Sequence, residues 1–265
     1  MQLLRQNGET IGLVPTMGAL HEGHLSLLSI AQTKSSKTVA TIFVNPTQFT
    51  NASDLENYPR PIEADIKKLQ NAGCDVLFMP PVTEMYTKGE QWHIDLGELE
   101  HLLEGRFRMG HYQGVTQIVY KLFDVVKPNM AFFGQKDYQQ FMVISKMVEI
   151  LKIPVELTMC PILREPGGLA MSSRNIHLSA DERQHALALS HVLTYVKRNF
   201  DKGKIVQLTA DAISMLSAES DVVPDYFTIA DADTLQPADN KTKHIIALTA
   251  AQVGKTRLID NMIIC

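Results

Sequence analysis

Two closely spaced histidines in a glycine-containing segment are the strongest sign of chemistry in this sequence. The segment reads Pro15-Thr16-Met17-Gly18-Ala19-Leu20-His21-Glu22-Gly23-His24. His21 and His24 are three residues apart, so both imidazoles can point toward one bound group. Gly23 removes a side chain and lets a nucleotide base or ribose approach the backbone. If a helix begins here, its free N–H groups and partial positive charge favour a bound phosphate.

Other interpretations of these motifs fit the spacing less well. Zinc sites of the H-E-x-x-H type place their histidines four residues apart, and this pair is one residue short. A purely structural role for two histidines at a helix start is a further alternative. Gly254-Lys255-Thr256 resembles the end of a P-loop, but Thr249 stands where that loop needs glycine. No G-x-G-x-x-G follows any predicted strand, so a dinucleotide fingerprint is absent.

A second group of polar residues follows a buried apolar run at 132–140. Lys136 lies where a lone cation can meet a phosphate or a carboxylate, although an ordinary surface lysine is an alternative. Asp137 suits the N-cap of the following helix. Gln140 lies one turn into that helix and can face the same crevice. We therefore expect this segment to contribute to the same site as the two histidines.

Two further segments offer hydrogen-bonding groups for a polar ligand. In Thr41–Phe49, Asn45 and Gln48 are uncharged partners, although Pro46 also allows a turn role for Asn45. Met171-Ser172-Ser173-Arg174-Asn175 combines two hydroxyls, successive backbone N–H groups and a guanidinium, which together form a compact phosphate clamp. Nearby, Ser179 with Glu182 predicts a capping box for the next helix.

These segments are joined by alternating strands and helices. Strands are predicted at residues 11–14, 39–44, 75–79, 130–133 and 155–159, and helices from about 23 and at 62–70, 115–126 and 137–151. Such alternation predicts an α/β fold, a Rossmann-like doubly wound parallel sheet with helices on both faces. Ligands bind at the carboxyl ends of such strands, which is where the polar segments lie.

The pattern changes after Pro161. Helices are predicted at residues 180–200 and 205–218, followed by strands at 226–230, 244–250 and 256–264. Helices followed by consecutive strands indicate a second, smaller α+β domain with an antiparallel sheet. We place the domains at residues 1–162 and 163–265, and the second carries the Ser-Ser-Arg clamp.

Composition limits the class of protein. The chain has 265 residues, 45% hydrophobic content and a net charge of −4, which excludes a disordered chain and makes nucleic-acid binding through a basic surface unexpected. Three separated cysteines are typical of a reducing compartment rather than of a disulfide framework or a zinc site. No apolar run is long enough for a membrane span, and the first residues lack a signal peptide's apolar stretch. We expect a cytoplasmic protein.

Taken together, the motifs resemble the pantoate–β-alanine ligase family. The resemblance is carried by residues 15–24, 43–49, 58–60, 110–115, 121–123, 133–140 and 168–175. H-x-G-H alone would indicate only the wider nucleotidylyl-transferase superfamily, whereas 133–140 and the Ser-Ser-Arg-Asn segment are more specific. The family condenses pantoate with β-alanine at the expense of ATP, through pantoyl adenylate, and releases AMP and pyrophosphate.

The resemblance implies roles for individual residues. The ATP-binding residues would be Met17, Gly18, Ala19, Leu20, His21, Glu22, Gly23, His24, Gly134, Gln135, Lys136, Asp137, Leu163, Met171, Ser172, Ser173 and Arg174. The catalytic residues among them would be His24 as proton donor, His21, Lys136 and Arg174. Gln48 and Gln140 would bind pantoate, and Gln48 also β-alanine. ATP would come with Mg²⁺, no residue is assigned as a metal ligand, and a homodimer is expected.

Departures from the family pattern are few. Arg106, Met109 and Gly167 replace residues usual in the family, and only ten residues precede Ile11 where the family has a further strand and most of a helix. We expect that difference to lower the stability of the fold before it affects the reaction.

Two other functions remain as alternatives to the ligase. One is a nucleotidylyltransferase that stops at the adenylylated product, and the second is a non-catalytic nucleotide- or RNA-binding module. The net charge and the complete set of histidines and cations argue against the second.

Overall fold

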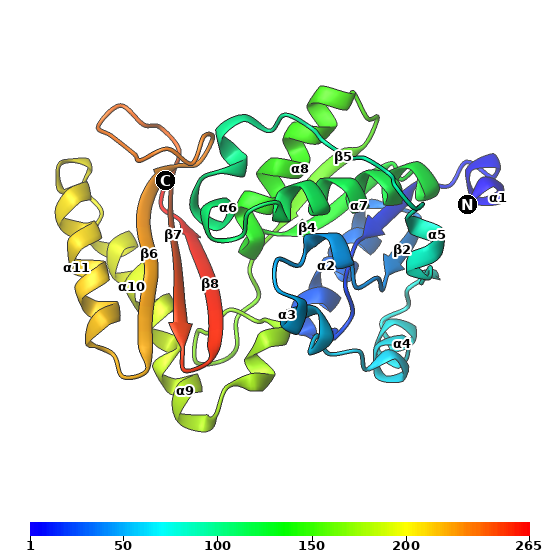
Figure 1. Ribbon diagram of the computed structural model, residues 1–265. Helices are drawn as coiled ribbons and strands as arrows, with labels where there is room; N and C mark the ends of the chain where they lie inside the picture. Colours follow the sequence, from blue (N-terminus) through cyan, green and yellow to red (C-terminus); the bar gives the residue numbers. More distant parts are fainter. The chain divides into compact units, whose positions relative to one another are not determined.

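Five short parallel strands form the sheet of the first unit of the chain, Met1–Pro161. The structure, a computed structural model, describes residues 1–265. The strands are β1 (Ile11–Val14), β2 (Lys37–Thr41), β3 (Val76–Phe78), β4 (Met130–Gly134) and β5 (Glu156–Cys160). Their order is β3-β2-β1-β4-β5, and each neighbouring pair is parallel (Figure 1). From β1 the chain therefore moves outward through β2 to β3 on one side, and then through β4 to β5 on the other side.

Helices cover both faces of this sheet. The longer ones are α2 (Glu22–Lys34), α4 (Ile62–Asn71), α7 (His111–Val126) and α8 (Tyr138–Leu151), and the shorter ones α1 (Gln2–Gln6), α3 (Ala52–Glu56), α5 (Val82–Met85) and α6 (Leu103–Phe107). Ile11 and Leu13 of β1 share a buried core with α7 and α8, whereas Val14 belongs to the core under α2 and α4. Alternate residues of a strand point to opposite faces, so both faces are buried. The predicted doubly wound parallel sheet is confirmed.

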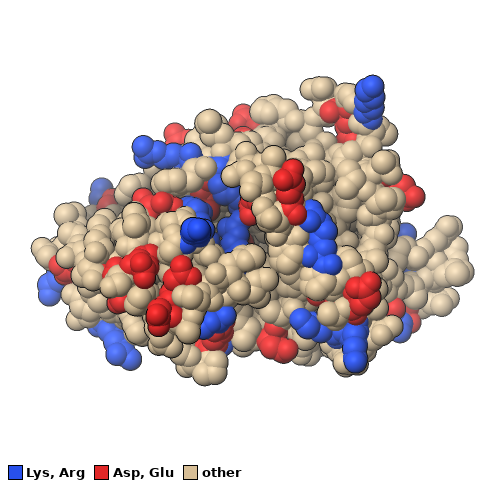
Figure 2. Space-filling view, turned by 60° about the horizontal axis from the view of Figure 1, so that its bottom comes forward, with Lys and Arg blue, Asp and Glu red and all other residues tan.

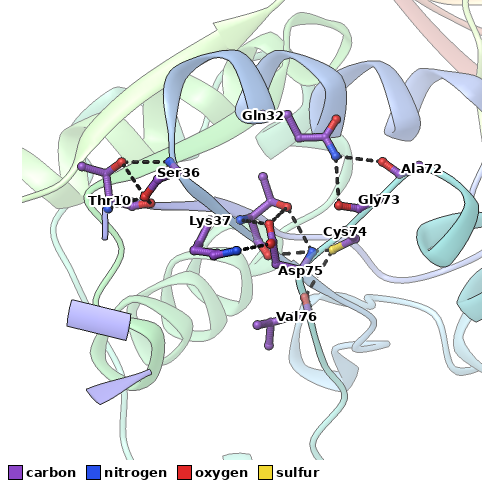
Figure 3. Close-up of polar contacts among 10 residues, drawn as sticks. Thr10, Gln32, Ser36, Lys37, Ala72, Gly73, Cys74, Asp75 and Val76 are labelled. Carbon is purple, nitrogen blue, oxygen red and sulfur yellow. Dashed lines mark hydrogen bonds and ion pairs between the residues drawn. The ribbon is translucent and has the colours of Figure 1, made fainter. Parts of the chain in front are cut away.

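The amino ends of three strands are tied together by polar side chains (Figure 3). Asp75, just before β3, accepts hydrogen bonds from Nζ of Lys37 (2.8 Å) and from the backbone N (2.8 Å) and Oγ1 (3.0 Å) of Thr38. Just before β1, the backbone N of Thr10 donates to Oγ of Ser36 at 2.8 Å, and the backbone N of Ser36 donates back to Oγ1 of Thr10 at 2.9 Å. These contacts help set the register of β1, β2 and β3 at the edge remote from their carboxyl ends.

The second unit, Ile162–Cys265, contains an antiparallel sheet and three helices. Its strands are β6 (Val222–Asp231), β7 (Ile245–Val253) and β8 (Thr256–Ile263), and its helices are α9 (Ala180–His185), α10 (Leu187–Asn199) and α11 (Ile205–Ala218). β7 lies in the centre of the order β6-β7-β8 and is buried along nearly its whole length. Leu193 of α10 and Leu216 of α11 pack in one core with Ile245. The predicted smaller α+β domain is confirmed.

Two predicted elements differ from those observed. The helix predicted at 180–200 is two helices, because the backbone N of Leu189 bonds the carbonyl of Ala186, three residues back, and tightens the chain there. The capping box of Ser179 and Glu182 at the start of α9 is present. The strand predicted at 39–44 ends at Thr41, where the N–H of Thr16 bonds Oγ1 of Thr41 at 3.1 Å in place of the carbonyl that the ladder would use.

The surface carries charges of both signs. On the face drawn in Figure 2, lysine and arginine side chains are interspersed with aspartate and glutamate. None of the chain's helices combines the length and the apolar character that crossing a membrane requires.

Candidate active site

Three of the predicted polar segments meet the carboxyl edge of the parallel sheet. The loop after β1 and the first turn of α2 carry residues 17–24, the loop after β2 carries Gln48, and the turn after β4 carries residues 134–137. β1 and β4 are adjacent strands whose outgoing connections diverge, and a crevice outside the strand ends forms at such a switch point. The topology therefore places these three segments at the position where doubly wound sheets bind ligands.

The first segment, residues 17–21, forms a tight loop, which we call the nucleotide loop after the role that the sequence predicts for it. Gly18 has φ +84° and Ala19 has φ +50°, a left-handed conformation that a non-glycine residue adopts only where its surroundings hold it. The hydroxyl of Thr16, just before the loop, accepts from the N–H of Gly18 at 3.2 Å and donates to the carbonyl of Thr41. The loop is thus anchored to the end of β2.

A buried carboxylate holds the middle of the nucleotide loop. Asp65 of α4 is 0% exposed. Its Oδ2 accepts from the N–H of Ala19 at 2.7 Å and its Oδ1 from the N–H of Leu20 at 2.8 Å. The Nζ of Lys68, one turn further along α4, donates to the carbonyl of Leu20. Because these two N–H groups are engaged by protein, recognition of an anion by this part of the loop depends on side chains.

His21 and His24 form a reciprocal cap at the start of α2. Nδ1 of His21 accepts from the N–H of Gly23 at 3.1 Å, and Nδ1 of His24 accepts from the N–H of His21 at 3.4 Å. The ring centroids are 4.1 Å apart. A neutral imidazole that accepts at Nδ1 carries its proton on Nε2, so the cap makes both rings Nε2–H donors. The structural role that the sequence left open, capping of the helix start, is therefore present. The cap also orients both rings so that their Nε2–H groups can bind a ligand.

The electrostatic surroundings keep His24 uncharged. Burial and the neighbouring His21 lower the pKa of His24 to about 3, well below the ordinary 6.5, and Lys136 and Lys68 add to this shift. At neutral pH, His24 is therefore a neutral hydrogen-bond donor. The same contributions show that two cations lie near its ring, which is the environment that a polyphosphate needs.

The segment after β4 contributes a cation and open space. Lys136 lies in a short 3-10 turn, Gln135–Asp137, and its side chain is partly buried. Asp137 occupies the N-cap position of α8 but makes no capping hydrogen bond through its exposed side chain. A Cβ added to Gly134 would meet nothing within 4 Å, so the end of β4 faces open space. Gln140 lies partly buried in the first turn of α8.

Gln48 is held in place by protein contacts. The residue is 8% exposed, its Oε1 accepts from Nδ2 of Asn45 at 3.1 Å, and its Nε2 lies 3.0 Å from the sulfur of Met17. Asn45 in turn donates to the carbonyl of Gly114 at 3.0 Å and accepts from the hydroxyl of Tyr86 at 2.6 Å. Asn45 is thus a buried framework residue, and it fixes one face of the Gln48 amide, which retains one N–H and one lone pair.

A neutral histidine supports the backbone of Gln48. His111, at the start of α7, is 4% exposed, and burial, together with the charge of Arg108, lowers its pKa to about 4. Its Nδ1 donates to the carbonyl of Gln48 at 2.7 Å, and its Nε2 lies 3.1 Å from a guanidinium nitrogen of Arg108. The carbonyl requires the proton on Nδ1, so Nε2 accepts from Arg108. His111 therefore links the Gln48 loop to a cation.

The remaining predicted residues lie on the second unit. Leu163 is 40% exposed, and its carbonyl accepts from the N–H of Met171 at 3.0 Å. Ser172 caps the turn Ser173–His177, because its Oγ accepts from the N–H of Arg174 at 3.2 Å. Within this turn, the buried Asn175 donates to Glu165 at 2.9 Å and to the carbonyl of Ala170 at 3.1 Å. The Ser-Ser-Arg segment is thus a compact, anchored turn within its own unit.

Asp65 and Lys68 were missed by the sequence analysis. Asp65 falls between Ile62 and Leu69 at the three- and four-residue spacing of the apolar face of α4. A carboxylate within an apolar face is the signal that could have marked it, because a buried charge needs partners. The sequence could not show that those partners are backbone groups about 45 residues away.

Comparisons with known proteins agree with this geometry. Residues 1–263 match the profile of the family described as pantoate-beta-alanine ligase. The chain is 46% identical over 259 residues to a pantothenate synthetase of Acetivibrio thermocellus, covering 97% of this chain and 92% of that protein. It is also 46% identical over 263 residues to a pantothenate synthetase of Thermotoga neapolitana, covering 98% of this chain and 94% of that protein.

Solved structures show the same likeness. A crystal structure of pantothenate synthetase from Thermus thermophilus superposes with a TM-score of 0.93 at 40% identity, covering 97% of this chain and 94% of that one. A structure of pantoate-beta-alanine ligase from Francisella tularensis, complexed with beta-gamma ATP and beta-alanine, has a TM-score of 0.80 at 35% identity. The match covers 97% of this chain and 90% of that one. With its doubly wound sheet, its paired histidines and a match along nearly its whole length, the chain belongs to the pantoate-beta-alanine ligase family.

Proposed function

We propose that this chain condenses pantoate with β-alanine at the expense of ATP, through pantoyl adenylate, and releases AMP and pyrophosphate. The observation that carries the proposal is the cap formed by His21 and His24, which gives both rings an Nε2–H donor and places the neutral His24 next to cations at the carboxyl edge of the sheet. That arrangement suits a polyphosphate, and the family to which the chain belongs uses one. The Francisella tularensis ligase, solved as a complex with beta-gamma ATP and beta-alanine, also supports the proposal.

In the first step, a carboxylate oxygen of pantoate attacks the α-phosphorus of ATP. The bond from that phosphorus to the bridging oxygen breaks, and pyrophosphate leaves with the electron pair. Negative charge grows on the phosphoryl oxygens during the displacement, and preorganised donors stabilise it. We assign this task to the Lys136 ammonium and to Nε2–H of His21 and His24. Because the pKa of His24 is about 3, His24 acts at neutral pH as a hydrogen-bond donor rather than as an imidazolium acid.

In the second step, the neutral amine of β-alanine attacks the acyl carbon of the adenylate. The bond from that carbon to the phosphate oxygen breaks, AMP leaves with the electron pair, and the nitrogen loses one proton to give the amide. No covalent enzyme nucleophile is needed, so catalysis rests on alignment, which is worth about 10⁵–10⁸ M in effective concentration. Gln48 and Gln140 would orient the hydroxyls and carboxylate of pantoate without a tight ion pair. Gln48 suits this task because Asn45 and Met17 already fix its amide. We also assign Gln48 to β-alanine.

ATP would make further contacts along the chain. We assign them to residues 17–24, to Gly134–Asp137, to Leu163 on the adenine and to Met171–Arg174 on the triphosphate. Mg²⁺ would enter with ATP, and when bound it would neutralise phosphate charge. No group of three or more His, Cys, Asp or Glu side chains is arranged to hold a metal ion, and both oxygens of the buried Asp65 are engaged by backbone N–H groups. A cation whose ligands are mainly phosphates and waters fits this donor set.

A two-stage assay tests the reaction. Pantoate-dependent exchange of labelled pyrophosphate into ATP should occur without β-alanine, and AMP should be released once β-alanine is added. Exchange without amine-dependent AMP release would instead support a nucleotidylyltransferase, and ATP binding without exchange would support a non-catalytic module.

His24→Ala tests the assigned site. This variant should lose exchange while its circular dichroism spectrum stays that of the parent, because His21 still caps α2 by accepting from the N–H of Gly23. Near-normal exchange would contradict the role assigned to His24. Arg174→Met, on the second unit, should raise the KM for ATP.

We also propose a cytoplasmic homodimer as the working form. The family resemblance motivates the dimer, and the three separated free cysteines suit a reducing compartment. Light scattering coupled to size-exclusion chromatography should give about twice the mass of one chain, and fractionation of the source cells should recover the protein with the cytoplasmic contents. A monomeric mass at working concentration would contradict the dimer.

A further inference from the structure

Helix α4 contacts the nucleotide loop with two charged side chains that no role proposed above uses. Asp65 and Lys68 lie one turn apart, and both reach the backbone of Ala19 and Leu20. The carboxylate accepts two N–H groups, one on each oxygen, and the ammonium donates to the carbonyl of Leu20. Together they engage three backbone groups of a loop that is remote in sequence.

The two contacts select one conformation of the loop. A residue with a Cβ is disfavoured at positive φ, yet Ala19 has φ +50° while its N–H bonds Asp65 at 2.7 Å. A Cβ at Gly18 would lie 3.0 Å from Oδ2 of Asp65, so the loop approaches the carboxylate closely on its glycine side. A fully buried carboxylate is stable only where its hydrogen bonds are kept, so loop and helix constrain each other.

The same contacts determine where the histidines and Lys68 lie. Leu20 directly precedes His21, the N-cap of α2, so the conformation of Ala19 and Leu20 sets the position of the capped rings. Lys68 lies close enough to His24 to contribute to the lowering of its pKa. Its ammonium can therefore add positive potential to the site while it holds the loop.

We propose that Asp65 and Lys68 are positioning residues for ATP, which hold Ala19 and Leu20 so that the imidazoles of His21 and His24 face the triphosphate. This inference rests on the proposed function only in assuming that the nucleotide loop binds ATP. It predicts a larger effect on ATP than on pantoate. Gln140 lies on α8, and Gln48 is held by Asn45 and, at its backbone carbonyl, by His111, while it touches the loop through the sulfur of Met17.

The test compares Asp65→Asn and Lys68→Met with Glu63→Gln and Lys67→Met, which change exposed residues of the same helix. Binding of a non-hydrolysable ATP analogue is measured by titration calorimetry, and the KM values for ATP and pantoate by pyrophosphate exchange. We expect Asp65→Asn and Lys68→Met each to weaken ATP binding about tenfold, as loss of a charge-assisted hydrogen bond would. The KM for pantoate and both control variants should stay within about twofold of the parent.

Unchanged ATP binding in both variants would overturn the proposal. Parallel weakening for ATP and pantoate, tracking a lower midpoint of thermal unfolding, would also overturn it, because the residues would then be merely structural. If Asp65→Asn does not fold, Lys68→Met decides, since its side chain is partly exposed. If the parent binds the analogue but shows no exchange, the proposed function fails while the calorimetry still decides this inference.

Discussion

His24 should remain neutral through the pH range in which a histidine in water becomes charged. Burial is the main reason, and the nearby His21 and Lys136 reinforce it, so that the pKa of His24 lies at about 3 instead of 6.5. At pH 5.5, a pKa of about 3 leaves about 0.3% of the ring protonated, whereas an ordinary histidine would be about 90% protonated. The two values differ enough for a direct titration to separate them.

The assay is a series of long-range ¹H–¹⁵N correlation spectra of uniformly ¹⁵N-labelled protein between pH 8 and pH 5. The chain has nine histidines, so the His24 signals are assigned by their absence in His24→Gln. We expect the pattern of an Nε2–H tautomer with no change in either ring nitrogen across the series. A peptide covering residues 19–26, titrated alongside, supplies the ordinary transition.

A midpoint near 6.5 for the His24 ring nitrogens, or an Nδ1–H pattern, would refute both the assigned tautomer and the role of a neutral donor. A second perturbation checks the cause. Lys136→Met should raise the pKa of His24, and Lys68→Met should raise it less, because Lys136 contributes more to the shift. In both variants the pKa should stay below 6.5, because burial remains. A pKa that returned to 6.5 in Lys136→Met would mean that charge rather than burial dominates.

Three further predictions concern residues that support the fold or the loop that carries Gln48. His111 has a folded-state pKa of about 4, so the unfolded state binds more protons below pH 6.5, and the free energy of unfolding should fall by up to about 1.4 kcal/mol per pH unit as pH drops from 6.5 toward 4. Urea titrations at pH 7.5 and 5 should show a smaller pH dependence in His111→Gln, and an equal dependence would contradict the linkage. Asp75→Asn should cost about 1–2 kcal/mol in urea unfolding but leave all KM values unchanged, because Asp75 ties the opposite edge of the sheet; altered KM values would contradict this separation. A Cβ in Gly114→Ala would lie 2.3 Å from the carbonyl oxygen of Thr47 and 2.7 Å from the N of Gln48, so the loop must move. Its KM for pantoate should rise about tenfold or more while binding of an ATP analogue stays near the parent value, and an unchanged KM would argue against Gln48 as a pantoate ligand.

Much of the fold follows from local pattern. The strand at residues 11–14 and the helix at 205–218 agree with their predicted bounds, because apolar periodicity and flanking turn residues act within a few residues of each other. Where tertiary contacts compete, the bounds change. The strand predicted at 39–44 stops at Thr41 because the N–H of Thr16 bonds the side chain of Thr41 instead of its carbonyl, and that partner lies far away in sequence.

Residue types and their spacing predicted which groups could do the chemistry: two histidines three apart, a lysine after a strand, and glutamines in place of charged groups. The chemical state of these groups depends on the folded surroundings. Each imidazole tautomer follows from the backbone group that bonds its Nδ1, and the low pKa of His24 follows from its burial near cations. Asp65 became part of the site only through folding, because a carboxylate acts through the N–H groups that surround it, and those come from a loop about 45 residues away.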